Sequence, residues 1–110
     1  MSAASEYDQR QYRRMLQTIF RYENGNDSLR NLVYDLQTLV GVLEEKDIGW
    51  STRYTNLWGP IDDIYQVVVS YKGKGITEDD QREILNRTAA LKSLIAEKVA
   101  DSDLTDPGDA

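Results

Sequence analysis

The sequence predicts an all-α protein, a small bundle of four main helices. The first observation behind this prediction is an apolar period of 3.6 residues that dominates most of the chain. The second is that strand signals are confined to the run Val67–Val69, inside a longer helical period. A chain of 110 residues is in the usual range for one domain with one core. We therefore expect a single helical domain over residues 1–100.

The first helix is expected from about Glu6 to Tyr22. Its apolar residues, expected on one face, are Tyr12, Leu16, Ile19 and Phe20. It is expected to stop at Asn24-Gly25, a dipeptide that readily takes the left-handed conformation found after a helix C-terminus.

The second helix has the most regular pattern in the chain. Asp27 or Ser28 is expected to cap its first turn, because both side chains offer an oxygen to free backbone N–H groups. Gly41 lies inside it, at a cost of about 1 kcal/mol relative to alanine. Its apolar stripe keeps helical spacing over seven residues: Leu29, Leu32, Val33, Leu36, Leu39, Val40 and Leu43.

The third helix is expected to begin at an Asp47 cap and to be kinked or broken at Gly59-Pro60. A proline inside a helix removes one backbone donor and crowds the carbonyl four residues earlier, here that of Asn56. The stripe continues in phase across Pro60, so both halves are expected to pack on the same core. Its residues are Tyr54, Leu57, Trp58, Ile61, Ile64, Tyr65, Val68 and Tyr71.

The last helix follows a turn at Lys72–Gly75. Thr77 and Asp80 resemble a capping box and are expected to open it. Its apolar residues run to Val99. The last ten residues, 101–110, are expected to form an acidic disordered tail.

Charge is distributed unevenly along the chain, whose net charge is −6. The last ten residues hold four aspartates and no base, and residues 1–22 hold four arginines against two acids, a net of +2. Residues 23–63 hold eight acids against three bases, a net of −5. This acidic middle repels a nucleic-acid backbone and attracts a basic partner. The expected partner is therefore a protein and not a nucleic acid.

Histidine and cysteine are both absent from the chain. Most proton shuttles, thiol nucleophiles and transition-metal sites in enzymes use one of these two side chains. The sequence therefore favours binding over catalysis, with no cofactor and no metal. The first residues lack the features of a signal peptide, and no apolar stretch approaches membrane-spanning length. A cytoplasmic location without membrane contact is expected.

Two pairs of carboxylates leave an enzymatic alternative open. Glu44 and Asp47, and likewise Asp80 and Glu83, stand three residues apart, and helical nucleotide hydrolases bind magnesium through acidic pairs of this kind. Capping, solvation and the helix macrodipole account for acids at these positions without a metal, and we favour that explanation.

Trp50 has two possible roles. It falls one turn before Tyr54, beside several carboxylates, so it is either a partly exposed anchor for a protein partner or a core residue. Tyr34, Val67 and Val69 lie off the main apolar stripes and are secondary candidates for a binding surface. The residues predicted to bind the partner are Glu44, Glu45, Asp47, Trp50, Asp62 and Asp63.

A series of motifs spans about residues 20 to 96. It reads Tyr22-Glu23-Asn24-Gly25, then Ser28-Leu29-x-x-Leu32-Val33-x-Asp35-Leu36-x-x-Leu39, then Leu43-Glu44-Glu45-Lys46-Asp47-x-x-Trp50, and continues with Tyr54, Trp58, Asp62 or Asp63, Tyr65, the turn Lys72 to Gly75, and Leu91 to Ile95. This series resembles small bacterial immunity proteins of contact-dependent inhibition and polymorphic toxin systems. The interruption at Gly59-Pro60 departs from the continuous helix of that pattern.

The resemblance implies a protein that binds and blocks a cognate toxin domain, often a nuclease, by stoichiometric occlusion. The alternative is a helical adaptor or regulatory protein-interaction domain, which would use the same scaffold for a different partner.

Overall fold

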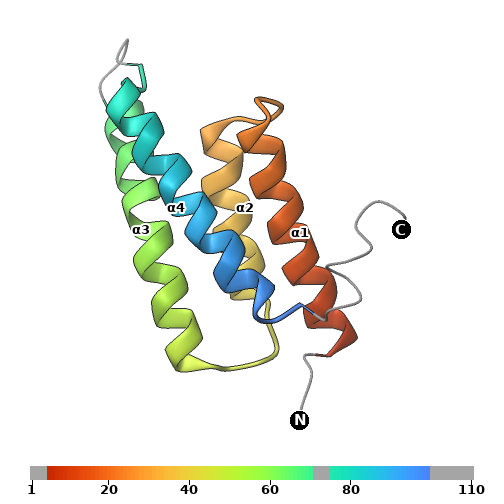
Figure 1. Ribbon diagram of the computed structural model, residues 1–110. Coiled ribbons are helices and arrows are strands. Elements are labelled where there is room, and N and C mark those ends of the chain that lie inside the picture. Colours follow the sequence, from red (N-terminus) through yellow and green to blue (C-terminus); the bar gives the residue numbers. More distant parts are fainter. Residues whose placement is uncertain (1–4, 71–74, 100–110) are drawn as a thin grey trace.

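The computed structural model describes residues 5–70 and 75–99, and in these ranges the chain forms helices and no strand. The predicted all-α bundle is confirmed. Its helices are α1 (Glu6–Glu23), α2 (Leu29–Gly41), α3 (Ile48–Ser70) and α4 (Glu78–Ala96). The chain runs up and down, so that α1 pairs with α2 and α3 pairs with α4 (Figure 1). The predicted acidic tail, 101–110, and most of the predicted turn at Lys72–Gly75 lie outside the described residues.

The turn after α1 confirms the expected role of Asn24-Gly25. Gly25 has a φ of 80°, and its N–H donates to the carbonyl of Tyr22 at 3.0 Å. The N–H of Asn26 donates to the carbonyl of Arg21 at 2.8 Å. These two bonds satisfy carbonyls that the end of a helix leaves free, and the left-handed residue that closes them favours glycine.

The helix starts follow the capping prediction. The Ser28 hydroxyl accepts from the N–H of Asn31 at 3.1 Å, so Ser28 and not Asp27 is the cap of α2. An Asp47 carboxylate oxygen accepts from the N–H of Trp50, also at 3.1 Å. At the start of α4 the Thr77 hydroxyl accepts from the N–H of Asp80, whose carboxylate accepts in return from the N–H of Thr77.

The second helix is shorter than its apolar stripe. It ends at Gly41, where the N–H groups of Val42 and Leu43 donate to the carbonyls of Leu39 and Val40. These i to i−3 bonds tighten the last turn into the following linker. Leu43 is still buried. The apolar stripe therefore predicts its burial correctly but overestimates the length of the helix.

The third helix is continuous through Pro60. The predicted break therefore does not occur, and a kink is not confirmed. Pro60 leaves the carbonyl of Asn56 without its usual donor four residues later. Asn56 lies on the exposed side of α3, so water can donate to its carbonyl and the helix can continue.

One core fills the space between the four helices. All buried side-chain polar atoms in the described part of the chain have a hydrogen-bond partner. None of the four helices there combines the length and apolar character needed to cross a membrane. The buried apolar side chains are Tyr12, Met15, Ile19, Tyr22, Leu29, Leu32, Val33, Leu36, Leu43, Trp50, Tyr54, Ile61, Ile84, Leu91, Leu94, Ile95 and Val99.

Three aromatic side chains of α3, spaced four residues apart, donate to backbone carbonyls of its neighbours. The indole N–H of Trp50 donates to Leu94 in α4 at 3.0 Å. The Tyr54 hydroxyl donates to Leu36 at 2.9 Å, and the indole N–H of Trp58 donates to Val33 at 3.1 Å, both in α2. These bonds fix the axial position of α3 against both helices.

Alanine substitutions at two glycines should have opposite effects on stability. Gly25→Ala should lower the free energy of unfolding by about 1 kcal/mol, because the positive φ disfavours a side chain. Gly59→Ala should raise it by up to about 1 kcal/mol, because a methyl group there meets no atom within 4 Å inside a continuous helix. Urea unfolding measures both. Destabilisation by Gly59→Ala would indicate that α3 is interrupted at this point in solution.

Candidate protein-interaction surface

A polar network occupies the end of the bundle where the predicted acids of the α2–α3 linker lie. Its centre is the carboxylate of Asp8 in the first turn of α1, a side chain that is only 1% exposed. Its two oxygens accept from the backbone N–H groups of Glu44 and Glu45 at 2.8 and 2.9 Å. These bonds satisfy the buried carboxylate, and through them Asp8 connects α1 to the linker.

The side chains of the same linker are also engaged within the chain. Lys98, just after α4, donates to the carboxylates of Glu45 at 3.2 Å and Asp47 at 2.8 Å. The Tyr12 hydroxyl donates to the other oxygen of Glu45 at 3.2 Å. Glu44 accepts from the hydroxyl of Ser5 at 3.0 Å and is exposed. Two of these three predicted partner-binding acids therefore neutralise a lysine of the same chain.

The pKa values of this network reflect its internal pairing. Hydrogen bonds from Lys98 and from the N–H of Trp50 hold the pKa of the Asp47 carboxyl below its usual value. Burial opposes the charge of Lys98, but its hydrogen bonds to Asp47 and Glu45 outweigh burial and raise its pKa. Burial, together with the charge of Glu45, raises the pKa of the Tyr12 hydroxyl. These contacts therefore favour the charged forms of Asp47 and Lys98.

Trp50 belongs to the core, which corrects its assignment as a partner-binding residue. The side chain is 3% exposed, and its ring packs against the rings of Tyr12 and Tyr54 at centroid distances of 5.5 and 5.2 Å. Its indole N–H is already bonded to Leu94. The helical spacing that places Trp50 one turn before Tyr54 also directs it inward, so no surface is left to anchor a partner.

Asp62 and Asp63 lie elsewhere, in the second half of α3. Asp62 is 15 residues beyond Asp47, which corresponds to about 22 Å along a helix. The structure therefore does not bring the predicted acids together in one patch. Asp62 accepts from the side-chain amide of Gln66 at 3.2 Å, and Asp63 has no hydrogen-bond or ion-pair partner among the described residues. Asp63 is exposed, and neither of its carboxylate oxygens accepts a hydrogen bond from a described residue.

The side of α3 that faces away from the core carries apolar residues as well as these acids. Ile48 is 80% exposed, Val67 41% and Val69 54%. We call the exposed side of α3 that carries these three residues and Asp62 and Asp63 the α3 outer face. Ile48 lies about 21 Å along the helix from Asp62, and Val67 and Val69 lie on opposite flanks of this face. Exposed apolar residues beside carboxylates make this side of α3 the candidate surface for protein binding.

An aromatic pair borders the α3 outer face on the side of α2. The rings of Tyr34 in α2 and Tyr65 in α3 meet edge to face at a centroid distance of 5.9 Å. The guanidinium of Arg30 lies 5.6 Å from the centre of the Tyr34 ring. Tyrosine and arginine are enriched where protein interfaces concentrate their binding energy. Tyr34, Val67 and Val69, which lie off the main stripes of the sequence, are all exposed.

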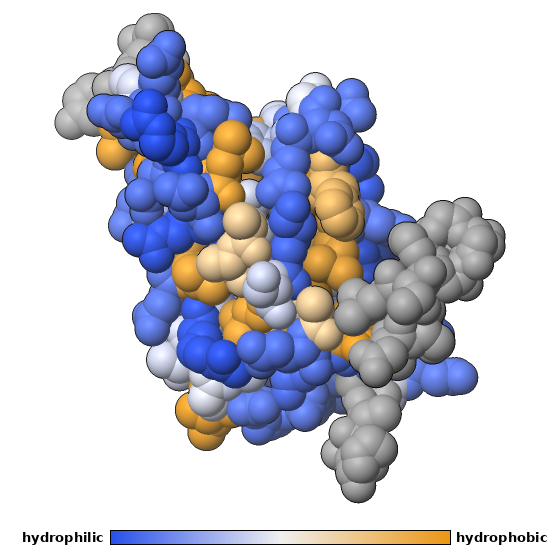
Figure 2. All heavy atoms as spheres, in the orientation of Figure 1, coloured by the Kyte–Doolittle hydropathy of each residue, from blue (hydrophilic) through white to orange (hydrophobic). Residues whose placement is uncertain are grey.

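The face formed by α1 and α4 is a weaker candidate for protein binding. It is mostly hydrophilic, with hydrophobic residues in the seam between the two helices (Figure 2). Phe20 is exposed there, but the ammonium of Lys92 lies 5.0 Å from its ring centre and also pairs with Glu23 at 2.7 Å. The ammonium of Lys92 therefore already contacts the exposed ring of Phe20.

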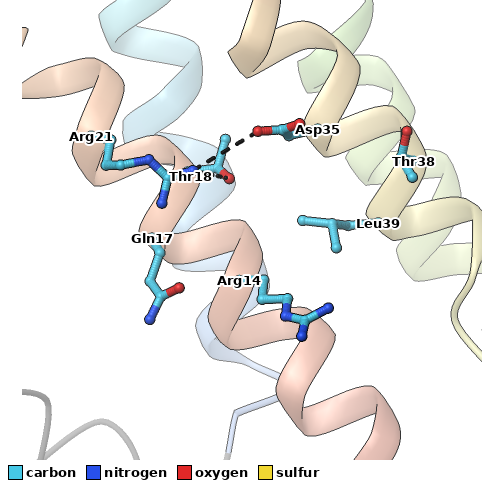
Figure 3. Close-up of a pocket in the computed structure, with 7 residues that line it drawn as sticks. All are labelled: Arg14, Gln17, Thr18, Arg21, Asp35, Thr38 and Leu39. Carbon is cyan, nitrogen blue, oxygen red and sulfur yellow. Dashed lines mark hydrogen bonds and ion pairs between the residues drawn. The ribbon is translucent and has the colours of Figure 1, made fainter. Parts of the chain in front are cut away.

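A groove of about 370 Å³ between α1 and α2 is polar. Figure 3 shows Arg14, Gln17, Thr18 and Arg21 of α1 facing Asp35, Thr38 and Leu39 of α2. Arg21 pairs with Asp35 at 3.9 Å and with Asp27 at 3.3 Å, which neutralises much of the charge. With one apolar residue in its lining, this groove lacks the apolar walls of a typical ligand pocket.

The carboxylate pairs considered for magnesium do not share a site. Glu44 lies in the α2–α3 linker and Asp80 in the first turn of α4, at opposite ends of the bundle (Figure 1). Glu83 pairs with Arg87 at 2.6 Å, and Asp80 closes a capping box. Within the described ranges, no three acidic residues gather where they could hold a metal ion.

Asp8→Asn should lower the free energy of unfolding by about 1–3 kcal/mol. The asparagine amide keeps one oxygen that can accept a hydrogen bond. Its NH₂ group replaces the second oxygen, so one of the two backbone N–H groups loses its acceptor. Glu6→Gln is the matched control, because Glu6 is exposed in the same helical turn, and should change stability by less than about 0.5 kcal/mol. Urea unfolding compares the two variants. Equal effects would contradict the role of Asp8 in connecting α1 to the linker.

Stability should fall as the pH drops below about 4, in part because of Asp47. A carboxyl whose folded-state pKa is depressed below its ordinary value, here 3.8, stabilises the fold above that value, and this contribution is lost as the pH falls through the folded-state pKa. Lys98→Met removes the group that depresses it. The difference in urea midpoint between the parent chain and Lys98→Met should therefore shrink from pH 7 to about pH 3. A constant difference would mean that Lys98 acts only through packing.

Comparisons with protein-family models, with curated proteins and with solved structures found no match for this chain. Of the six residues predicted to bind a partner, Glu45, Asp47 and Trp50 are committed to contacts within the bundle, whereas Asp62 and Asp63 lie on the α3 outer face.

Proposed function

We propose that this chain is an immunity-type protein that binds a cognate toxin domain and blocks it by stoichiometric occlusion. The observation that carries the proposal is the α3 outer face, where exposed Ile48, Val67 and Val69 accompany two carboxylates. Exposed apolar groups bordered by polar ones are typical of protein interaction sites. The identification of the partner as a toxin domain rests on the resemblance of residues 20–96 to immunity proteins.

The mechanism of such a protein requires binding and no chemistry. A rigid helical surface excludes substrate from the partner for as long as the complex lasts, so its effectiveness depends on slow dissociation. In this proposal the protein acts in the cytoplasm of the producing cell and uses no cofactor. A negatively charged surface also suits a nuclease partner, whose substrate cleft is basic.

Co-expression with the toxin domain encoded by the adjacent upstream reading frame tests the proposal. Cells that produce both proteins should grow, whereas cells that produce the toxin domain alone should not. With purified proteins, toxin activity should fall linearly and reach zero at one chain per toxin domain. A catalytically inactive toxin domain is the control for toxicity, and it should still form the complex.

Two outcomes would contradict the proposal. If the toxin domain remains active in a molar excess of the chain and no complex is found, the protein does not neutralise it. If the upstream frame encodes a signalling component that binds the chain, the adaptor alternative explains the surface instead.

A further inference from the structure

A groove of about 340 Å³ lies between the second half of α3 and the start of α4. It is lined by Asp63, Ile64 and Val67 of α3 and by Thr77 and Asp80 at the start of α4. The groove thus places Val67 of the α3 outer face and the partly buried Ile64 beside carboxylates contributed by two helices. Its volume is at the lower end for ligand pockets and suits a single side chain.

Both carboxylates of the groove can accept further hydrogen bonds. Asp63 has no partner among the described residues. One oxygen of Asp80 accepts from the N–H of Thr77 at 3.3 Å, which leaves the other oxygen available. The acids of the α2–α3 linker differ in this respect, because Glu45 and Asp47 are paired with Lys98.

The surroundings of the groove are acidic. Residues 62–87 hold six acids and four bases, a net charge of −2. Of the four bases, Arg82 pairs with Asp79 at 2.7 Å and Arg87 with Glu83 at 2.6 Å, and Lys72 and Lys74 lie outside the described residues. A group that enters the groove therefore meets negative charge together with apolar surface.

An arginine or lysine side chain matches this combination. Its methylene stem packs on apolar groups such as Ile64 and Val67, while its charged end reaches the carboxylates. An arginine can bond to carboxylates with two parallel N–H groups, which adds geometric specificity. A neutral side chain would leave the negative charge of the carboxylates unbalanced, and an acidic one would be repelled by it.

We infer that the α3–α4 groove receives an arginine or lysine side chain of the partner protein and so docks a basic partner surface on the α3 outer face. This inference rests on the proposed function for the identity of the partner, and on charge complementarity for its chemistry. It places the binding surface at Asp63 and Asp80 and not at the α2–α3 linker. One side chain in this groove buries much less than the roughly 800 Å² per partner of a standard interface, so the partner must also contact exposed residues around the groove.

An NMR titration of the full chain with the peptide acetyl-Gly-Arg-Gly-amide tests the groove directly. Backbone amide shifts should change around Asp63, Ile64, Val67 and Asp80 and should saturate. The citrulline peptide, which has the same shape without the charge, should not bind. Asp63→Asn combined with Asp80→Asn should weaken binding by about fivefold, while Glu44→Gln should leave it unchanged. Asparagine at position 80 keeps an acceptor for the Thr77 N–H, and an unchanged amide spectrum elsewhere verifies that the variant is folded.

Three results of this titration would overturn the inference. They are shift changes centred on residues 44–47, equal binding of the arginine and citrulline peptides, and the absence of saturable binding.

Binding measurements with the toxin domain distinguish the proposed function from the inference about the groove. If the toxin domain binds, Asp63→Lys should slow association and weaken the complex at least tenfold, and Glu44→Lys should not. The reverse pattern would overturn the inference and leave the proposed function standing. If the toxin domain does not bind but the arginine peptide does so as expected, the proposed function fails and the groove remains a site for a basic partner.

Discussion

The carboxylate of Asp8 is the group on which one end of this bundle depends. It satisfies two backbone N–H groups of the α2–α3 linker, a segment with no helical bonds of its own at Glu44 and Glu45. Through Glu45 the same linker is tied to Lys98, and the side-chain amide of Gln9 donates to the Lys98 carbonyl at 2.8 Å. Three segments far apart in the sequence thus meet around one buried charge. Because an unsatisfied buried carboxylate is costly, the three segments are held in place together.

The sequence predicts the helices and most of their caps because these depend on neighbouring residues. Ser28 and the Thr77–Asp80 box act within one turn, and the left-handed Gly25 follows from the residue type. The continuity of α3 through Pro60 could not be predicted, because it depends on the exposure of the Asn56 side of the helix.

Prediction of the candidate site fails where contacts are distant in sequence. Asp8 and Glu44 are 36 residues apart and Asp47 and Lys98 are 51 apart, so no local pattern indicates that they are partners. An acid near a helix start looks the same in the sequence whether it is paired or free. Asp47 is paired, whereas Asp63, which the sequence places just after Pro60, lies within a continuous helix and has no partner among the described residues, and only the fold distinguishes them.

The three aromatic donors of α3 have a further consequence for binding. Trp50, Tyr54 and Trp58 hold the helix at one axial position against α2 and α4, so its outer side is presented in a single arrangement. A surface that is already ordered loses little conformational entropy when a partner docks. The aromatic series, although it lies largely inside the bundle, thus makes the exterior of α3 preorganised. Affinity at that exterior would then depend on residues that the partner never touches.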